Sequence, residues 1–285
     1  MSLTVGIIGL GLIGGSFAKT IAARTDARVL GTDIDKVVVS WAISEGAIVR
    51  ELDDRDLTDC DFVILALRPQ DAIDWMIEHV SVLSDESIIF DVGGIKRRMS
   101  EEVSALCAQR GLRFVGAHPM AGYHEGGFAH SSEHLFDGAS FIISTDEHTD
   151  PSAVNTLEHF VETLGFGQVV VTTPDEHDEI VAFTSQLAHL VSSAYIKDPD
   201  ALRHAGFSAG SFQDMTRVAI LDADMWSELM SENADMLVPH IDNLLSHLSQ
   251  YRDALSEGDR DRLARLLQDG VDAKRISIES CDDTL

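Results

Sequence analysis

The chain has 285 residues, 45% of them hydrophobic, which is enough to build the cores of two ordinary globular domains. Its 21 basic residues are outnumbered by 48 acidic ones, and the net charge of −27 disfavours nucleic acid or an anionic membrane surface as partners. No apolar run is long enough to span a membrane, and the three widely spaced cysteines, Cys60, Cys107 and Cys281, argue against a disulfide framework and a zinc site. We therefore expect a cytoplasmic protein whose acidic surface reflects either a salty habitat or simply a well-solvated exterior.

The first predicted element is a short strand that ends in a glycine cluster, and a helix follows directly. Gly9, Gly11 and Gly14 fit the pattern Gly-x-Gly-x-x-Gly. In this pattern the first glycine permits the turn, the second lets the backbone approach a pyrophosphate, and the third lets the helix pack on the strand. Leu12 and Ile13 belong to the helix N-terminus that would face the phosphates. The stretch predicts a dinucleotide-binding fold.

A second predicted strand, residues 28–33, ends in Asp33, which lies 19 residues after Gly14. This is near the spacing of the carboxylate that binds a ribose hydroxyl in dinucleotide folds. Because a carboxylate would repel a 2′-phosphate, Asp33 predicts NAD rather than NADP as the cofactor. The neighbouring Thr32 and Lys36 leave some room for the other nucleotide.

Strand-like and helix-like stretches continue to alternate up to residue 172, which is typical of a mostly parallel sheet covered by helices. The predicted elements are a helix over 35–46, a strand over 61–67, a helix over 70–80, a strand over 87–92, a helix over 97–109, strands over 113–117 and 139–144, a helix over 152–164 and a strand over 167–172. We therefore predict an α/β fold, with a Rossmann-like, doubly wound sheet in residues 1–172.

Residues 173–285 are predicted to form an all-helical domain, because no β-rich run appears and the apolar residues recur every three or four positions. The spacing predicts helices over 176–196, 212–221, 225–257 and 259–278, the third of them bent at Pro239, and a loop over 198–211. The large apolar side chains are more than this half can bury alone, which predicts a homodimer. They are Trp226, Leu229, Met230, Met236, Leu237, Leu244, Leu245 and Leu248.

The residues with chemical potential follow the predicted strands, and ligands of open α/β sheets bind outside the carboxyl ends of the strands. Arg68, Gly93 and Gly94 come directly after two such ends, and we predict that Arg68 and Gly93 contact the cofactor. His118 lies one residue past the predicted strand 113–117 and precedes a proline, so rigid backbone holds it where a nicotinamide would lie. Hydride removal from a carbinol carbon needs a base for the hydroxyl proton, and neutral imidazole has a suitable pKa. His118 is therefore the predicted catalytic base.

Three motifs together resemble the prephenate/arogenate dehydrogenases of tyrosine biosynthesis, and the likeness runs from the first strand to about residue 280. They are Gly93-Gly94-Ile95-Lys96 after Asp91-Val92, the string Gly116-Ala117-His118-Pro119-Met120-Ala121-Gly122, and Ser211-Phe212-Gln213-Asp214-Met215-Thr216-Arg217 followed by Trp226. The resemblance implies an NAD(P)-dependent oxidative decarboxylation without a metal. Hydride would leave the hydroxyl-bearing ring carbon, and carbon dioxide would leave the opposite carbon as the ring becomes aromatic. The substrate would be a prephenate-like dicarboxylate, with arogenate or an amino-deoxy analogue as alternatives.

The resemblance also implies roles for individual residues. His118 looks like the base that hydrogen-bonds the ring hydroxyl, and Arg217 looks like the cation that binds a substrate carboxylate. A guanidinium offers a bidentate fork to a carboxylate, so the second role also makes chemical sense by itself. The alternative for Arg217 is a surface ion pair with Asp214 or Asp222.

Two further histidines, His177 and His189, match family histidines on the predicted helix 176–196. Twelve residues of an α-helix span about 18 Å and rotate by about 120°, so these two histidines cannot serve the same atom. We expect His189 to face the substrate pocket and include Gly94 and Gly210 in the same substrate-binding set. His177 is expected either to touch the cofactor or domain junction, or to be structural.

Gly94 departs from the family pattern, which usually has Gly-Ser here, with a serine hydroxyl that helps to hold the substrate hydroxyl and the histidine. Either water or another hydroxyl replaces it, or the substrate differs from prephenate.

Two other readings compete with this one. A β-hydroxyacid dehydrogenase would need a lysine in the body of helix 176–196, where only Lys197 follows its end. A non-catalytic, dinucleotide-sensing dimer would explain Gly94, but the retention of both His118 and Arg217 argues against it.

Overall fold

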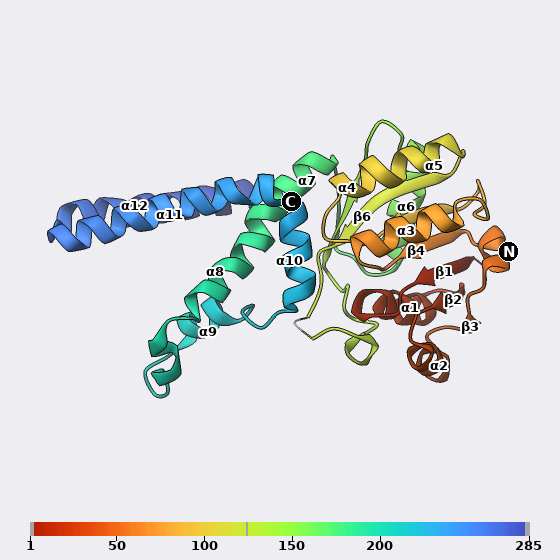
Figure 1. Ribbon diagram of the computed structural model, residues 1–285, viewed down its shortest axis with the longest axis horizontal. Coiled ribbons are helices and arrows are strands. Elements are labelled where there is room, and N and C mark those ends of the chain that lie inside the picture. Colours follow the sequence, from red (N-terminus) through yellow and green to blue (C-terminus); the bar gives the residue numbers. More distant parts are fainter. Residues whose placement is uncertain (1–2, 124, 283–285) are drawn as a thin grey trace. The chain divides into compact units, whose positions relative to one another are not determined.

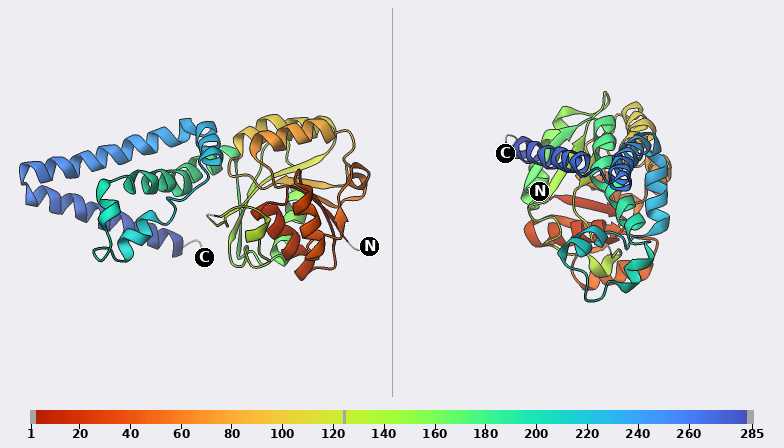
Figure 2. Two further views of the ribbon diagram at one scale, coloured as in Figure 1. Left: turned by 60° about the horizontal axis from the view of Figure 1, so that its bottom comes forward. Right: turned by 90° about the vertical axis from the view of Figure 1, so that its left-hand side faces the viewer.

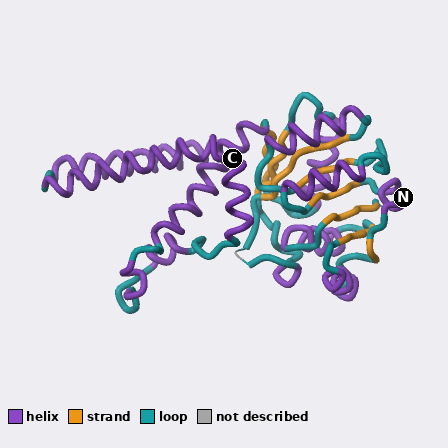
Figure 3. Tube along the Cα trace, viewed as in Figure 1, coloured by secondary structure: helices purple, strands orange, loops and turns teal. Residues whose placement is uncertain are grey.

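The computed structural model describes residues 3–123 and 125–282 of the chain. It divides into two compact units, Met1–Ala234 and Asp235–Leu285. The first unit contains the sheet, the helices that cover it and several further helices, whereas the second consists of two long helices (Figures 1 and 3).

The sheet of the first unit has the strand order β3-β2-β1-β4-β5-β6-β7-β8. Neighbouring strands pair in parallel except β6 and β7, which are antiparallel. The strands are β1 (Thr4–Ile8), β2 (Arg28–Thr32), β3 (Arg50–Glu51), β4 (Phe62–Leu65), β5 (Ile88–Asp91), β6 (Arg113–Pro119), β7 (Ser140–Ser144) and β8 (Gln168–Thr172). The prediction of a mostly parallel, Rossmann-like sheet is confirmed.

Helices cover both faces of this sheet, because alternate side chains of each buried strand point to opposite sides and both sets are apolar. Phe62 and Ile64 of β4 join the core on one face, and Val63 and Leu65 join the core on the other. The first core is closed by α1 (Leu12–Arg24), α2 (Lys36–Ser44), the short η3 (Phe128–His130) and α6 (Pro151–Thr163). The second is closed by η1 (Asp54–Asp59), α3 (Pro69–His79) and the continuous α4 (Arg97–Met99), η2 (Ser100–Ser104) and α5 (Ala105–Gln109) (Figure 1).

The register of the central strands brings their carboxyl ends to one edge. Ile8 lies beside both Thr32 and Leu65, and Leu65 lies beside Asp91. The residues that follow these four strand ends therefore share one edge of the sheet, as the sequence predicted for an α/β ligand site.

The strand that carries the candidate base is longer than predicted. β6 continues past residue 117 to Pro119, so His118 belongs to the strand and lies opposite Ile142 of β7. The antiparallel partner β7 supplies hydrogen bonds beyond the point where β5 ends, and this extends β6 past the sheet edge.

The remaining helices of the first unit follow β8. α7 (Pro174–Val181), the π-helical η4 (Ala182–Leu187) and α8 (Ala188–Tyr195) form one continuous helix, as predicted for 176–196. The predicted loop over 198–211 contains η5 (Pro199–Arg203), and α9 (Gly210–Thr216) ends earlier than expected. A new helix, α10 (Ala223–Glu232), starts at Asp222, whose carboxylate accepts a hydrogen bond from the Met225 N–H at 3.0 Å.

The prediction of one helix over 225–257 is wrong, because α10 ends at Glu232 and α11 (Ala234–Glu257) begins two residues later. The break lies at Asn233, which leaves helical geometry with φ −112° and ψ 22° and has a fully buried side chain. Pro239, the predicted bend, lies within α11 near its start. A buried amide that needs polar partners, not the proline, thus divides the helix.

The second unit is a helical hairpin of α11 and α12 (Arg260–Asp282) that turns at Gly258, whose φ is +68° (Figure 2). The Tyr251 hydroxyl donates to the Leu266 carbonyl at 3.1 Å and ties the two helices together. Several large apolar side chains of this hairpin are exposed, namely Val238, Leu245, Leu248, Leu255, Leu267, Val271, Ile276 and Ile278. None of the described helices is long and apolar enough to cross a membrane. The side chain of Cys281 lies outside the described part of the chain.

Candidate active site

The glycine loop has the geometry that a phosphate needs. Gly9 has φ +89°, and a Cβ there would lie 2.5 Å from the Ala66 carbonyl oxygen, whereas a Cβ at Gly14 would lie 1.9 Å from the Gly9 oxygen. These two glycines are thus required by the turn and by the packing of α1 on β1. A Cβ at Gly11 would meet nothing within 4 Å, and no side chain caps the N-terminus of α1. Helix α1 therefore begins with Leu12 and Ile13 beside open space, and its N-terminus fits a pyrophosphate.

Asp33 is fixed at the carboxyl end of β2. Its carboxylate accepts the Leu10 N–H at 2.7 Å and the Asp35 N–H at 2.9 Å, and each oxygen retains a free lone pair. Lys36, the nearby cation, forms an ion pair with Glu51 at 2.6 Å. The ribose corner therefore presents a rigid carboxylate, and its lysine is already neutralised.

The candidate base belongs to a chain of three side chains. His118 Nδ1 lies 2.9 Å from His177 Nε2, and His177 Nδ1 lies 2.6 Å from Asp178 Oδ1. His118 is half-buried at the end of β6, while His177 and Asp178 of α7 are buried. The structure thus brings His177 to the predicted base rather than leaving it as an isolated structural histidine.

Burial and neighbouring charges set the protonation of this chain. Burial lowers the pKa of His118 well below its ordinary value, and the nearby His177 and Lys96 lower it further. Burial also lowers the pKa of His177, against the opposing effect of Asp178. Burial alone would raise the pKa of Asp178, but hydrogen bonds from His177 and the Arg97 N–H outweigh it, so this pKa lies below its usual range. At neutral pH His118 is therefore uncharged, and the ionised Asp178 lies at the far end of the chain.

A buried ion pair supports the strand end beside His118. The Lys96 ammonium contacts the Asp91 carboxylate, and the two residues are only 1% and 2% exposed. Asp91 also accepts the Gly93 N–H at 2.9 Å and the Ala117 N–H at 3.3 Å. The carboxylate therefore joins the end of β5 to β6, and the lysine is held away from solvent.

A second buried network holds α10 against the helix that carries His177. Asn233 donates to the Asp178 carbonyl at 2.9 Å and to Gln186 Oε1 at 3.0 Å, and it accepts from Arg97 at 3.1 Å. Gln186 donates in turn to the Leu229 carbonyl at 3.3 Å. This network fixes the end of α10 relative to the histidine chain.

His189 packs on Trp226 of α10 and lies near Arg217. The His189 ring stacks on Trp226, with centroids 3.9 Å apart, and its Nδ1 donates to the Ser185 carbonyl at 2.8 Å. Burial lowers the pKa of His189, and the positive charge of nearby Arg217 also lowers it. Arg217 is exposed, and within the described chain no carboxylate lies at ion-pair distance from it. The alternative of a structural ion pair with Asp214 or Asp222 is therefore not observed.

The other predicted residues divide into two groups. Arg68, at the start of α3, lies 3.7 Å from Asp222 and 3.8 Å from Glu228. A Cβ at Gly94 would lie 3.6 Å from Leu229 Cδ1, an ordinary contact, so both residues face α10. Gly210 begins α9, where an added Cβ would meet nothing within 4 Å, so the structure does not join it to the residues above.

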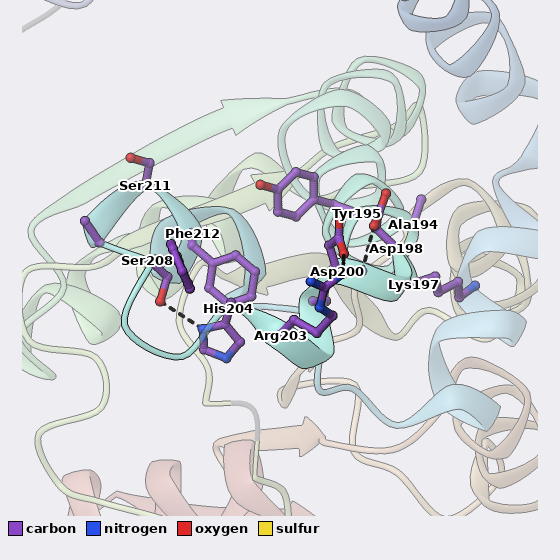
Figure 4. A pocket seen from close by; sticks show the side chains of 13 residues that line it. Ala194, Tyr195, Lys197, Asp198, Asp200, Arg203, His204, Ser208, Ser211 and Phe212 are labelled. Atoms are coloured by element: carbon purple, nitrogen blue, oxygen red, sulfur yellow. Dashed lines mark hydrogen bonds and ion pairs between the residues drawn. The ribbon is translucent and has the colours of Figure 1, made fainter.

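A separate pocket of about 1080 Å³ lies between the end of α8 and α9 (Figure 4). His204 stacks on Phe212 there, with centroids 4.4 Å apart, and its Nδ1 lies 2.8 Å from the Ser208 hydroxyl. Its lining contains neither the histidine chain nor Arg217. This pocket is therefore not the candidate active site.

Sequence reasoning missed Asp178 and Asn233 as parts of the site. The direct succession of His177 and Asp178 was a usable signal, since an acid next to a histidine can fix its tautomer. Asn233 gave no signal, because the apolar spacing continues on both sides of it.

Two family models match this chain. The family model "Prephenate dehydrogenase, nucleotide-binding domain" matches residues 17–171, and "Prephenate dehydrogenase, dimerization domain" matches residues 173–269. The chain is 29% identical over 282 residues to a prephenate dehydrogenase of Bacillus subtilis (strain 168), covering 95% of this chain and 75% of that protein.

Two solved structures are similar over nearly their whole length. Prephenate dehydrogenase from A. aeolicus, in complex with hydroxyphenyl propionate and NAD+, has a TM-score of 0.84 and 26% identity, covering 98% of this chain and 99% of that one. Synechocystis arogenate dehydrogenase has a TM-score of 0.80 and 26% identity, covering 96% of this chain and 100% of that one.

Proposed function

Because this chain belongs to the prephenate dehydrogenase family, we propose that it oxidises and decarboxylates prephenate to 4-hydroxyphenylpyruvate with NAD as the cofactor. The observation that carries the proposal is the position of His118, a neutral imidazole at the carboxyl edge of the sheet. This imidazole is hydrogen-bonded to the buried His177, which in turn contacts the buried Asp178 carboxylate.

The proposed cofactor site consists of the glycine loop, Asp33 and the strand ends beside it. Gly11, Leu12 and Ile13 would hold the pyrophosphate at the start of α1, and Asp33 would accept hydrogen bonds from the ribose. Arg68 and Gly93 follow the neighbouring strand ends and complete the predicted set. The bound dinucleotide supplies the hydride acceptor.

His118 would act on the substrate hydroxyl. As the carbon–hydrogen bond breaks and its electron pair leaves as hydride, the hydroxyl proton moves to the imidazole and a carbonyl forms. Loss of carbon dioxide then leaves its electron pair in the ring, which becomes aromatic, and the oxygen takes the proton back from the imidazole. The imidazole therefore holds the proton only transiently, which suits a histidine of low basicity.

Arg217 would bind a substrate carboxylate. Lys96 and Arg97 are the nearby alternatives, but Lys96 is buried against Asp91, and Arg97 binds Asp178 and Asn233. An exposed guanidinium is a strong carboxylate ligand because it donates two parallel hydrogen bonds. His189, which lies near Arg217, would line the same substrate site.

The direct test mixes the purified protein with prephenate and NAD and follows the absorbance of the reduced cofactor. We expect a larger kcat/KM for prephenate than for arogenate, and for NAD than for NADP. Reduction only with arogenate would transfer the proposal to that substrate, a candidate supported by the similarity to Synechocystis arogenate dehydrogenase and by Gly94. A preference for NADP would contradict the role of Asp33.

We further propose that the protein is a homodimer formed through its helical half. The matched dimerization domain and the exposed apolar side chains of α11 and α12 support this assembly. Light scattering coupled to gel filtration should give twice the chain mass. We also propose a cytoplasmic location, in keeping with the buried, unpaired thiols Cys60 and Cys107.

A further inference from the structure

We propose that His177 and Asp178 are positioning residues that fix the tautomer of His118, with the proton on Nδ1 and the lone pair on Nε2. The inference rests on the proposed function for its catalytic meaning, but the tautomer itself follows from contacts within the chain.

Both carboxylate oxygens of Asp178 accept backbone N–H groups. Oδ1 accepts the Lys96 N–H at 2.7 Å and lies 2.6 Å from His177 Nδ1, and Oδ2 accepts the Arg97 N–H at 2.9 Å. The two backbone N–H donors and His177 keep the pKa of Asp178 below its usual range despite its burial. Asp178 is therefore an ionised acceptor, and His177 Nδ1 must carry the proton that it shares with Asp178.

The protonation of His177 determines which nitrogen of His118 carries the proton. A neutral His177 that is protonated on Nδ1 has an unprotonated Nε2, which can only accept a hydrogen bond. Its neighbour at 2.9 Å is His118 Nδ1, which must therefore be the donor. A doubly protonated His177 would reverse this bond, but His177 is only 1% exposed and lies close to the Lys96 ammonium, and both conditions disfavour a second positive charge.

The tautomer determines which nitrogen of His118 can act as the base. With the proton on Nδ1, His118 Nε2 has the lone pair that accepts the hydroxyl proton, and the imidazolium formed at that moment is stabilised through His177 by the Asp178 charge. With the opposite tautomer, Nε2 would carry a hydrogen and could not act as a base. The same logic of an acid that orients a histidine operates in serine hydrolases.

The tautomers can be read directly by ¹⁵N NMR of the ligand-free, full-length protein labelled at histidine, at pH 8. We expect both His118 and His177 to show a protonated Nδ1 and an unprotonated Nε2, with His118→Asn and His177→Gln providing the assignments. A His118 protonated on Nε2, or a doubly protonated His177, would overturn the proposal. This measurement needs no substrate, so it stands apart from a failure of the proposed activity.

Variants of His177 then test the link to catalysis. His177→Leu removes the acceptor, and we expect kcat to fall about 10- to 100-fold, less than for loss of the base itself, with little change in KM. His177→Gln retains an amide oxygen that can accept from His118 Nδ1, so it should recover part of the loss and keep the His118 tautomer. Exposed His159, whose one hydrogen bond within the described residues is to the Asn155 carbonyl, is the matched control, and His159→Leu should change neither property.

A kcat of His177→Leu within about threefold of the parent, with the His118 tautomer retained, would show that His177 does not position His118. If the Leu variant fails to fold, the wild-type spectrum and the Gln variant still decide.

Discussion

The histidine chain and the predicted substrate-binding arginine satisfy their charges in opposite ways. Around the histidine chain, Asp178 and Lys96 are buried and each has several partners within the chain. By contrast, Arg217 is exposed, and no carboxylate in the described residues pairs with it. The groups that would handle the proton are thus pre-organised before any ligand arrives, whereas the cation that would bind the substrate remains available.

This difference has a physical reason. A base must have a defined tautomer and must be unprotonated when the substrate binds, and fixed, buried neighbours set both. A carboxylate-binding arginine needs no such tuning, because a guanidinium is always charged. In a chain with a net charge of −27, an internal acid on Arg217 would compete with an anionic substrate.

The largest effect is expected in the histidine chain, where His118→Asn should lower kcat by about 10²- to 10⁴-fold. Asparagine keeps a hydrogen-bonding shape but cannot take the proton. Steady-state kinetics and calorimetric titration with NAD measure turnover and cofactor affinity separately, and affinity should be unchanged. Turnover within about threefold of the parent would make His118 structural.

Lys96→Met tests the buried ion pair beside the histidine chain. Removing one partner leaves the Asp91 charge uncompensated in the interior, which should lower the free energy of unfolding by about 3–5 kcal/mol. Lys36→Met breaks the exposed pair with Glu51 instead and should cost about 0–1 kcal/mol. Denaturant unfolding compares the two, and equal losses would contradict the distinction between buried and exposed pairs.

Arg217→Gln tests the exposed arginine and should act on the substrate alone. A hydrogen bond to a charged group contributes about 1.5–3 kcal/mol, so kcat/KM should fall roughly 10- to 150-fold. Arg217→Lys should recover part of this loss, since the ammonium keeps the charge but lacks the fork. Arg203→Gln, which removes an exposed arginine paired with Asp200, is the control.

The Tm and the NAD affinity of the Arg217 variants should match those of the parent. If Arg217→Gln instead unfolds at a lower temperature or binds prephenate unchanged, Arg217 is structural and the anion is bound elsewhere.

The pH dependence of kcat should reflect the lowered pKa of His118. A histidine with a depressed pKa stays neutral as the pH falls, so kcat should hold from pH 8 to below about 6.5 and decline only under that value. The pKa values of the nearby His177 and Asp178 are both lowered, so His177 stays neutral and Asp178 stays ionised over this interval. A midpoint at or above pH 6.5 in the pH profile of kcat would show that burial does not lower the pKa of His118.

The smallest effect is expected for Gly94→Ser, which restores the hydroxyl usual in the family. Gly94 does not have a positive φ, and its added Cβ would make an ordinary contact with Leu229. The stability should therefore change by less than about 1 kcal/mol, with prephenate turnover equal to or above that of the parent. A variant that folds normally but loses all activity would indicate a pocket built for another substrate.

The sequence was sufficient for features whose role depends on local spacing. Gly9 and Gly14 fit a strand-to-helix turn, and the structure places both where a side chain would collide with backbone. Asp33 and His118 were predicted at the carboxyl edge because parallel strands align their ends, and the register confirms that edge.

Contacts between distant segments were beyond prediction. His177 meets His118 across 59 residues, and Asn233 meets the Asp178 carbonyl across 55. Neither pairing leaves a periodic trace, because a single polar residue in a helix has no spacing to read. The break at Asn233 was not predicted for the same reason, and the bend was expected at Pro239 instead.

The π-helical segment Ala182–Leu187 changes how the helix between the two site histidines should be read. A π-turn contains one residue more than an α-turn, so it removes roughly 100° from the rotation that a helical wheel would assign. His177 and His189 are twelve residues apart, which an uninterrupted α-helix would place about 120° out of phase. With the wide turn between them, the phase difference shrinks to about 20°, and one continuous helix presents both imidazoles toward the same side. A helical wheel drawn from the sequence separates two residues that the folded helix aligns.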